Sequence, residues 1–409
     1  TSPAKRERCT VTYRALLRFD AVGNLLLAAS LARLAERMLG LAVVLYALER
    51  FQSPPLAGWV AFAAMAPGLL VGPLAGALLD RIGAAGAIAL DMACSAGCVL
   101  LIALLCVERA DSAWSLVILV ALHSLSNPLS AAGVRTLLPG LVPAAALDRA
   151  NALDTSIHAA VDVCGPALAG ALFGFTGAAL TLLAVAVLYA AACVALLPAV
   201  RTPPHSLPAW RGGLLADAVA GVAHVLRHRS LRALSLAYAL YQMAWGILLV
   251  AVPVFVTRTA GGGTHGDLLV GALWAVSGVA GAVGALLAGH CGAPGRERAM
   301  MALGMLLTPL AIFPLGVGFG LPGLCLGLAL VGFLAGPVDV GVLTLRQRRT
   351  EPGWLGRVMA VSISLNLSGA PIGSALGGML LAWSVPAAFA VAALACGAAA
   401  LATAWVPKR

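Results

Sequence analysis

Three titratable residues at helical spacing are the first candidates for chemistry in this sequence. Asp154, His158 and Asp162 follow one another at intervals of four residues within a long apolar stretch. A helix would carry all three on one face, and Asp162 would lie about 15 Å from the end of the stretch. Because histidine titrates near neutral pH, this face could pass a proton along the helix. The alternative is that Asp154 and His158 only form local hydrogen bonds at a hydrated helix end.

A second charged group, formed by Arg33, Glu36 and Arg37, interrupts the first apolar stretch. Arg33 and Glu36 are three residues apart, so we predict that they pair on a helix. Two interpretations stay open: Glu36 binds a proton or a substrate under the control of Arg33, or the two form a permanent structural ion pair. Arg37 shares the face of Arg33 and could bind an anionic substrate, because guanidinium groups suit bidentate carboxylate contacts.

Other polar residues within apolar stretches are candidates for a substrate cavity. Tyr238, Gln242 and Trp245 stand at positions i, i+4 and i+7, which places them in one stripe of a helix. The stripe could serve helix packing, or it could form a wall for an amphipathic ligand. Asn127 and Asn366 could line the same cavity.

Two further carboxylates, Asp91 and Asp339, lie nearer the ends of their apolar stretches. Each is about two helical turns from the membrane surface. For both we predict structural pairing with loop arginines.

The composition requires a lipid environment for the elements that carry these residues. Of 409 residues, 61% are hydrophobic and only 10% are charged, whereas soluble proteins carry about 25% charged residues. A helix that crosses a bilayer needs about 20 apolar residues, and the sequence therefore predicts an all-α membrane protein with twelve transmembrane helices. The predicted spans are 25–48, 58–80, 84–107, 113–136, 151–172, 175–198, 233–257, 267–290, 298–319, 321–345, 357–382 and 385–406.

A long polar segment divides the predicted spans into two groups of six. We expect an N-terminal six-helix half at 1–199, a cytoplasmic linker at 200–232 and a C-terminal six-helix half at 233–409. Within the linker, residues 212–229 are predicted to form an amphipathic helix on the membrane surface.

Basic residues gather on the linker side of the predicted membrane. Outside the spans, only Arg50, Arg109 and Arg258 fall on the other side. The positive-inside rule therefore places both termini in the cytoplasm. The same asymmetry explains the net charge of +10 without a nucleic-acid partner.

The two halves repeat one another in sequence. RANALDTSIHAAVDVCGPALAGAL starts at Arg149, and RVMAVSISLNLSGAPIGSALGGML starts at Arg357. In this alignment Gly165 meets Gly373. Two parallel six-helix repeats, pseudo-symmetric and with a site between them near the membrane midplane, are typical of transporters that alternate access by rocking.

The stretch LAGALLDRIGAAGA connects predicted spans two and three and contains Gly76, Asp80, Arg81 and Gly83. Asp80 could contact a helix N-terminus or an arginine in one arrangement of the halves only, which would make the stretch a conformational switch. The pattern Gly-x-x-x-Asp-Arg-x-Gly resembles the loop signature of the major facilitator superfamily, although alanines follow where that family carries basic residues. With the twelve spans and the repeat, the resemblance implies the major facilitator fold and a secondary transporter.

Further segments resemble the drug:proton antiporter branch of macrolide and siderophore exporters. They begin at Val134 (VRTLLPGLVPAAALDRANAL) and at Arg346 (RQRRTEPGWLGRVMA). Gly165, Pro166 and Gly170 are similar to the antiporter motif of export proteins, and we predict a helix bend there. We therefore predict a proton-coupled exporter of a small amphipathic compound (drug, antibiotic or siderophore-like) in a bacterial inner membrane. The alternatives are an importer or facilitator of a small solute with the same fold, and a non-transporting sensor.

The sequence lacks the motifs of several other classes of protein. No Walker sequence, HExxH, GxSxG or zinc-finger spacing is present. We therefore predict no enzyme activity, no metal and no cofactor, with the proton gradient as the energy source. Cys94 and Cys98 are one turn apart, but no histidine or second cysteine pair completes a metal set. The expected partners are the lipid bilayer and a small-molecule substrate, and the predicted functional unit is a monomer.

Overall fold

The protein is helical throughout the part of the chain that the structure describes. The structure is a computed structural model, and it describes residues 21–72, 82–142, 144–200, 222–261, 263–291, 296–316, 318–350 and 365–407. Gly76, Asp80 and Arg81 of the predicted switch lie outside these ranges, as does most of the predicted linker.

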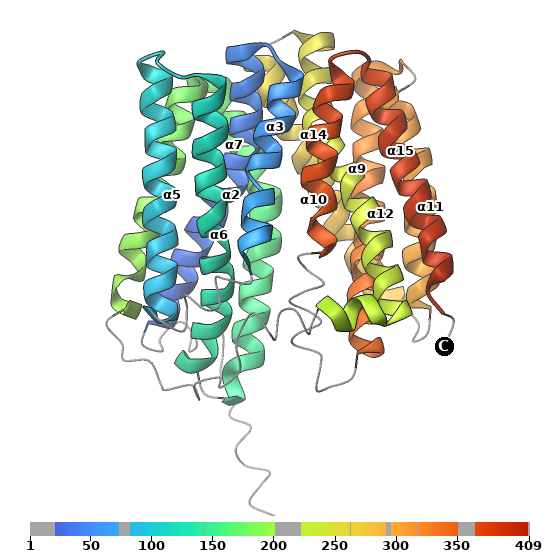
Figure 1. Cartoon of the computed structure of the whole chain (residues 1–409), viewed down its shortest axis with the longest axis horizontal. Coiled ribbons are helices and arrows are strands. Elements are labelled where there is room, and N and C mark those ends of the chain that lie inside the picture. The colour runs from blue at the N-terminus through green and yellow to red at the C-terminus, as the bar shows by residue number, and fades with distance from the viewer. Residues whose placement is uncertain are drawn as a thin grey trace, which may run out of the picture.

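The helices of the first half form one bundle (Figure 1). They are α2 (Val22–Phe51), α3 (Pro54–Ala63), α5 (Ala84–Val107), α6 (Ala113–Leu141) and α7 (Ala144–Val200). The span that begins with α3 extends to Gly72. α7 holds two spans, which meet at Gly177, where φ is 78° and ψ is 178°. Glycine adopts this conformation at little cost because it has no Cβ.

The helices of the second half form a second bundle beside the first (Figure 1). They are α9 (Arg229–Ala260), α10 (Thr264–Cys291), α11 (Glu297–Gly316), α12 (Gly320–Arg349), α14 (Gly369–Leu381), α15 (Val385–Ala402) and the short 3₁₀-helix η3 (Thr403–Trp405). α9 is the most enclosed of the candidate spans, with 61% of its most apolar window buried. The division of the chain at 199 and 232 stays a prediction.

Serine residues start three of the helices at the same end of the molecule. The hydroxyl groups of Ser53, Ser112 and Ser384 accept hydrogen bonds from backbone N–H groups in the first turns of α3, α6 and α15. Such caps satisfy donors that have no partner within the helix. We call this end, which also holds the turn at Gly177, the closed end.

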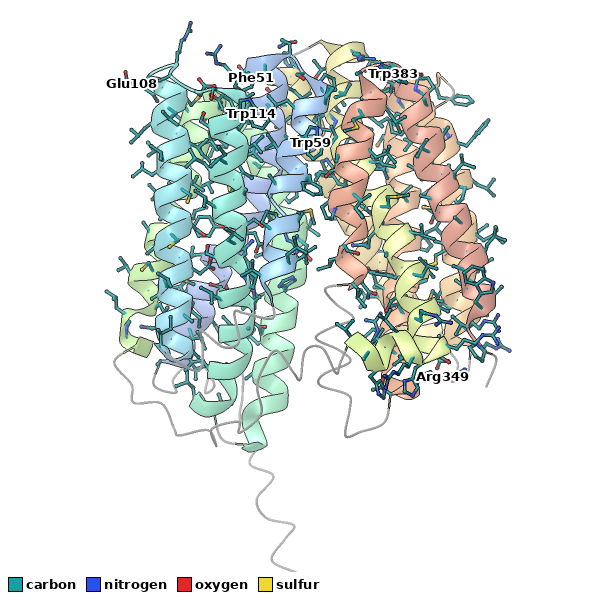
Figure 2. The ribbon with its side chains drawn as sticks, viewed as in Figure 1. Phe51, Trp59, Glu108, Trp114, Arg349 and Trp383 are labelled. Carbon is teal, nitrogen blue, oxygen red and sulfur yellow. The ribbon has the colours of Figure 1, made fainter. Side chains whose placement is uncertain are left out.

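The outer surface of the bundles is apolar, as a lipid-facing surface must be. Among the described residues, nine helices are long and apolar enough to cross a membrane. Leucines such as Leu70, Leu286 and Leu401 are largely exposed on them. Figure 2 shows Trp59, Trp114 and Trp383 near the closed end, where indole rings suit the membrane interface.

The two bundles meet through glycine residues near the closed end. α7 crosses α10, and α3 crosses α14. A Cβ atom added to Gly170 would lie 2.6 Å from the Cα atom of Gly271, and one added to Gly58 would lie 2.9 Å from the Cα atom of Gly378. Because no real Cβ fits at such distances, the backbones of the two halves touch directly.

Candidate functional site

A bidentate ion pair joins the first and fifth spans. Arg33 on α2 donates from Nη1 to Oδ1 of Asp154 on α7 at 2.6 Å and from Nη2 to Oδ2 at 3.2 Å. The two side chains are only 17% and 20% exposed. The predicted pairing of Arg33 with Glu36 is therefore wrong, because the close packing of α2 on α7 offers Arg33 a carboxylate that matches its planar donors.

A second ion pair lies further along the same two helices, one turn beyond Arg33 on α2 and two turns beyond Asp154 on α7. Arg37 Nε lies 2.7 Å from Oδ1 of Asp162, and Nε2 of His158 lies 4.0 Å from Oδ2. The three side chains are 42%, 46% and 45% exposed for Arg37, His158 and Asp162 respectively. Arg37 lies midway along α2, so this partly exposed ion pair lies near the middle of the span. We predicted a role in proton coupling for Asp154, His158 and Asp162, and that role stays a prediction.

Gly165 explains how α7 comes so close to this arginine. A Cβ atom at Gly165 would collide with the side chain of Arg37, so only glycine allows the contact. The backbone of α7 departs from helical geometry only at Gly177. The visible role of Gly165 and Gly170 is thus close packing. The helix continues through Pro166, and the predicted bend there stays a prediction.

Glu36 has a neutral partner. Nδ2 of Asn127 on α6 donates to Oε1 of Glu36 at 3.1 Å. The expectation that Asn127 lines a substrate cavity stays a prediction. Glu36 is partly buried and lies beside Arg37 in the chain.

The two carboxylates near the span ends also have neutral partners. Asp91 is buried, and the hydroxyl group of Ser95 donates to it at 3.4 Å. Tyr238 Oη donates to Oδ1 of Asp339 at 2.6 Å. Neither carboxylate pairs with an arginine within the described ranges, so the predicted pairing with loop arginines does not occur there.

The aromatic residues of the predicted stripe on α9 contact two different partners. Tyr238 bonds to Asp339, whereas Trp245 packs against Trp274 of α10 with the ring centroids 6.1 Å apart. Gln242 lies between them and is partly buried. Asn366 is buried, and its side-chain oxygen lacks a hydrogen-bond partner.

One buried polar pair was missed by the sequence analysis. His123 Nε2 on α6 lies 2.9 Å from Tyr189 Oη on α7, and both side chains are almost fully buried. The two rings meet edge to face. A lone histidine inside an apolar stretch was the signal available, because ionisable groups inside a membrane are rare.

The ion pair between Arg37 and Asp162 borders the contact between the halves. Val163 follows Asp162 directly, and a Cβ atom at Gly278 of α10 would lie 2.9 Å from the Val163 side chain. The backbone that carries Asp162 therefore takes part in the contact between the halves. Of the predicted switch, Gly83 is described: it has φ 76° and precedes α5.

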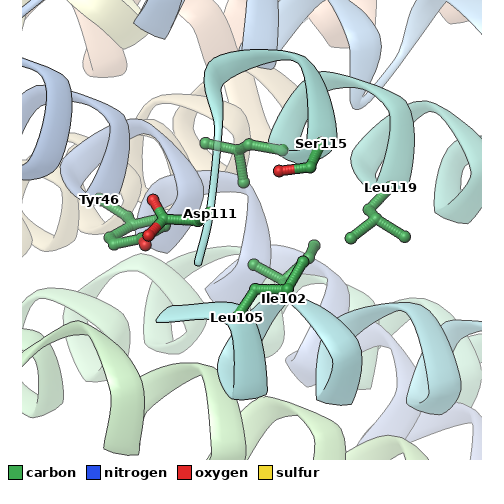
Figure 3. A pocket seen from close by; sticks show the side chains of 7 residues that line it. Tyr46, Ile102, Leu105, Asp111, Ser115 and Leu119 are labelled. Atoms are coloured by element: carbon green, nitrogen blue, oxygen red, sulfur yellow. The ribbon is translucent and has the colours of Figure 1, made fainter. Parts of the chain in front are cut away.

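A small hollow near the closed end is separate from this ion pair (Figure 3). It is lined by Tyr46, Ile102, Leu105, Asp111, Ser115, Leu116 and Leu119. It has no room for a water-sized ligand. Asp111 accepts a hydrogen bond from Arg50 Nε at 3.2 Å, which indicates a structural role for the acid.

No group of three possible metal ligands among His, Cys, Asp and Glu occurs in the described part of the chain. The cysteines described there, including Cys94 and Cys98, are free thiols.

Comparison with known proteins identifies the family. The model of the Major Facilitator Superfamily matches residues 25–361. The chain belongs to the major facilitator superfamily. It is therefore a multi-pass secondary transporter for a small molecule, not an enzyme.

A relative with a similar sequence comes from Sinorhizobium fredii (strain NBRC 101917 / NGR234). The chain is 48% identical over 401 residues to the uncharacterized MFS-type transporter y4rN, with 97% of each chain covered.

Solved structures share the fold at low sequence identity. The nucleoside transporter NupG matches with a TM-score of 0.75 and 12% identity, covering 94% of this chain and 98% of NupG. A POT family transporter in complex with 5-aminolevulinic acid matches with a TM-score of 0.71 and 13% identity, covering 94% of each chain. These matches support the predicted all-α fold of about twelve helices.

Proposed function

We propose that this transporter is a proton-coupled exporter of a small amphipathic compound, embedded in a bacterial inner membrane with both termini in the cytoplasm. The observation that carries the proposal is the ion pair between Arg37 and Asp162. It lies at mid-span, is partly exposed and borders the crossing of the two halves. A carboxylate in this position can exchange its arginine partner for a proton, and the exchange would change the packing at the crossing.

Among the described residues, several carboxylates inside the spans have neutral hydrogen-bond donors as partners. Arg33 and Arg37 each have a carboxylate partner, whereas Glu36, Asp91 and Asp339 are bonded to neutral donors. A carboxylate with a neutral donor can take up a proton without separating an ion pair. This supports proton binding inside the first half, with Glu36 as the second coupling group beside Asp162.

An amphipathic substrate is supported by the second half. Trp245 and Trp274 form an aromatic pair, and Tyr238 presents a hydroxyl group bonded to Asp339. Aromatic rings with polar tips suit ligands that have one apolar and one polar side. The resemblance of the segments from Val134 and Arg346 to macrolide and siderophore exporters supports transport out of the cell.

The proposed cycle starts from the arrangement in the structure. The halves touch near the closed end, which the charge distribution predicts to face outward. Substrate would enter from the cytoplasm or the inner leaflet, the halves would rock, and substrate would leave outward. Protonation of Asp162 or Glu36 from outside would then restore the first arrangement.

A growth-inhibition panel in an efflux-deficient bacterium tests this proposal. It compares wild type, Asp162→Asn and empty vector across macrolides, dyes and siderophore-like compounds, at matched expression. Asp111→Asn is the matched control, because Asp111 pairs with Arg50 at the closed end, away from the crossing. We expect protection against at least one compound, retained by the control and lost in Asp162→Asn.

Transport in inverted membrane vesicles then tests the coupling. An imposed proton gradient should drive uptake of the identified compound by wild type. Undiminished gradient-driven uptake by the double variant Asp162→Asn/Glu36→Gln would overturn the proposed coupling groups. Uptake by right-side-out vesicles instead would overturn export and favour an importer.

A further inference from the structure

A cavity with a basic wall opens at the end of the second half opposite to the closed end. It has a volume of about 490 Å³ and lies between the start of α9 and η3. Arg229, Arg232, Ala233, Leu236 and Trp405 line it. It is remote from the ion pairs described above, which lie on α2 and α7 of the other half.

The two arginines of this cavity have donors available for a ligand. Both side chains are exposed. Within the described residues, Arg229 has no hydrogen-bond or ion-pair partner, and Arg232 donates only from Nη1, to the carbonyl of Leu226 at 3.2 Å. Neither arginine pairs with a carboxylate in the ranges that the structure covers, so their positive charges are not compensated there.

Two other arginines nearby have a different role. Arg298 donates from Nε to the carbonyl of Thr403 and from Nη2 to that of Ala404, each at 3.2 Å. Arg349 donates from Nη2 to the carbonyl of Pro407 at 2.9 Å. These bonds hold the backbone on either side of Trp405, whose side chain is 58% exposed.

The remaining wall is apolar and extends from the start of α9 towards the middle of the helix. Leu236 is 43% exposed and lies seven residues beyond Arg229, or about 10 Å along α9. Tryptophan side chains favour the interface between lipid headgroups and hydrocarbon. The cavity therefore passes from two guanidinium groups to an apolar surface over the thickness of a lipid headgroup region.

We infer that this cavity binds an anionic phospholipid, with its phosphate on Arg229 and Arg232 and its acyl chains along Leu236 and Trp405. Guanidinium groups bind phosphate oxygens through paired, charge-assisted hydrogen bonds. Basic pockets at the cytoplasmic ends of membrane helices suit such headgroups. The apolar wall distinguishes a lipid from a free phosphate ion, which would gain nothing from Leu236 or Trp405.

Native mass spectrometry of the purified full-length protein tests this inference. The protein is titrated with phosphatidylglycerol, with phosphatidylcholine of the same acyl chains, or with inorganic phosphate. The variant is Arg229→Gln/Arg232→Gln, and Arg227→Gln/Arg109→Gln is the charge-matched control outside the cavity. Losing two basic contacts should weaken phosphatidylglycerol binding about thirtyfold in the variant and leave the control near wild type.

Several outcomes would overturn the lipid site. They are equal binding of the two lipids by wild type, and unchanged phosphatidylglycerol binding by the variant. If inorganic phosphate competes with phosphatidylglycerol at equal concentration, the cavity is a phosphate site and the lipid is rejected. Should the glutamine variant misfold, Arg229→Lys/Arg232→Lys keeps the charge. We expect it to bind phosphatidylglycerol more weakly than wild type but still in preference to phosphatidylcholine, and loss of that preference would also contradict the inference.

Discussion

At the scale of single residues, partners far apart in sequence define the chemistry of the interior. Arg33 and Asp154 are 121 positions apart, yet they form two hydrogen bonds with each other. In a medium of low polarity, removing one member of such a pair leaves an uncompensated charge. Removing both members leaves no uncompensated charge. The losses of stability caused by the two single substitutions should therefore not add up in the double variant.

A double-mutant cycle on this pair is our prediction at this scale. Arg33→Met and Asp154→Leu should each lower the free energy of unfolding by about 3 kcal/mol, towards the lower end for a buried pair because some water contact remains. The double variant should lose much less than the sum of the two. Thermal unfolding in detergent, followed by tryptophan fluorescence, measures all four proteins. Additive losses would contradict a coupled pair.

The sequence identified the charged residues of the site but not their partners. Intramembrane charge alone selected Arg33, Glu36, Arg37, Asp154 and Asp162, because such residues are costly in lipid. Their pairing depends on how α2, α6 and α7 are rotated about their axes, which hydropathy does not specify. Local spacing therefore suggested a bond between Arg33 and Glu36, whereas a neighbouring helix offered a better partner.

At the scale of helices, apolar stretches predicted the spans well and their ends less well. The break between spans five and six was expected at 172–175, but the turn lies at Gly177. Several small residues occur there, and hydropathy does not reveal which glycine adopts a positive φ. The serine cap at Ser53 similarly starts α3 at Pro54, before the predicted start at 58, whereas the predicted start at 385 is confirmed by α15.

The glycine contact between α7 and α10 leads to a prediction about conformation. Gly170→Val would place a branched side chain against the backbone of Gly271 and so force the halves apart near the closed end. Spin labels are attached at Glu108→Cys and Trp383→Cys in a cysteine-free background. Double electron–electron resonance then measures the distance between the labels, and so the separation of the halves. We expect longer distances than in the same labelled protein with Gly170.

Gly97→Val is the control for this experiment. Gly97 also lies on a helix, but a Cβ atom there would meet nothing within 4 Å. The distances between the spin labels in Gly97→Val should match those in the labelled protein that carries neither glycine substitution. The same distances for Gly170→Val would show that the glycine contact does not hold the halves together.

At the scale of the whole molecule, the distribution of charge predicts the orientation in the membrane. Glu108 lies at the closed end, shown in Figure 2, and Arg227 lies just before α9 at the opposite end. Both are exposed. In a cysteine-free background, Glu108→Cys should react with a membrane-impermeant maleimide in intact cells, and Arg227→Cys only after permeabilisation. The reverse pattern would place the termini outside and contradict the positive-inside assignment.

The charges of α2 also have a consequence for how the protein is made. Val22–Phe51 is not among the nine helices apolar enough to cross a membrane, since Arg33, Glu36 and Arg37 interrupt it. Each such charge costs about 2.5–3.5 kcal/mol when the translocon passes a helix into lipid. The neutralising Asp154 leaves the ribosome 121 residues after Arg33, or roughly 6–24 s later at ordinary rates of synthesis. We therefore expect the first span to enter the lipid fully only after the fifth span has left the ribosome.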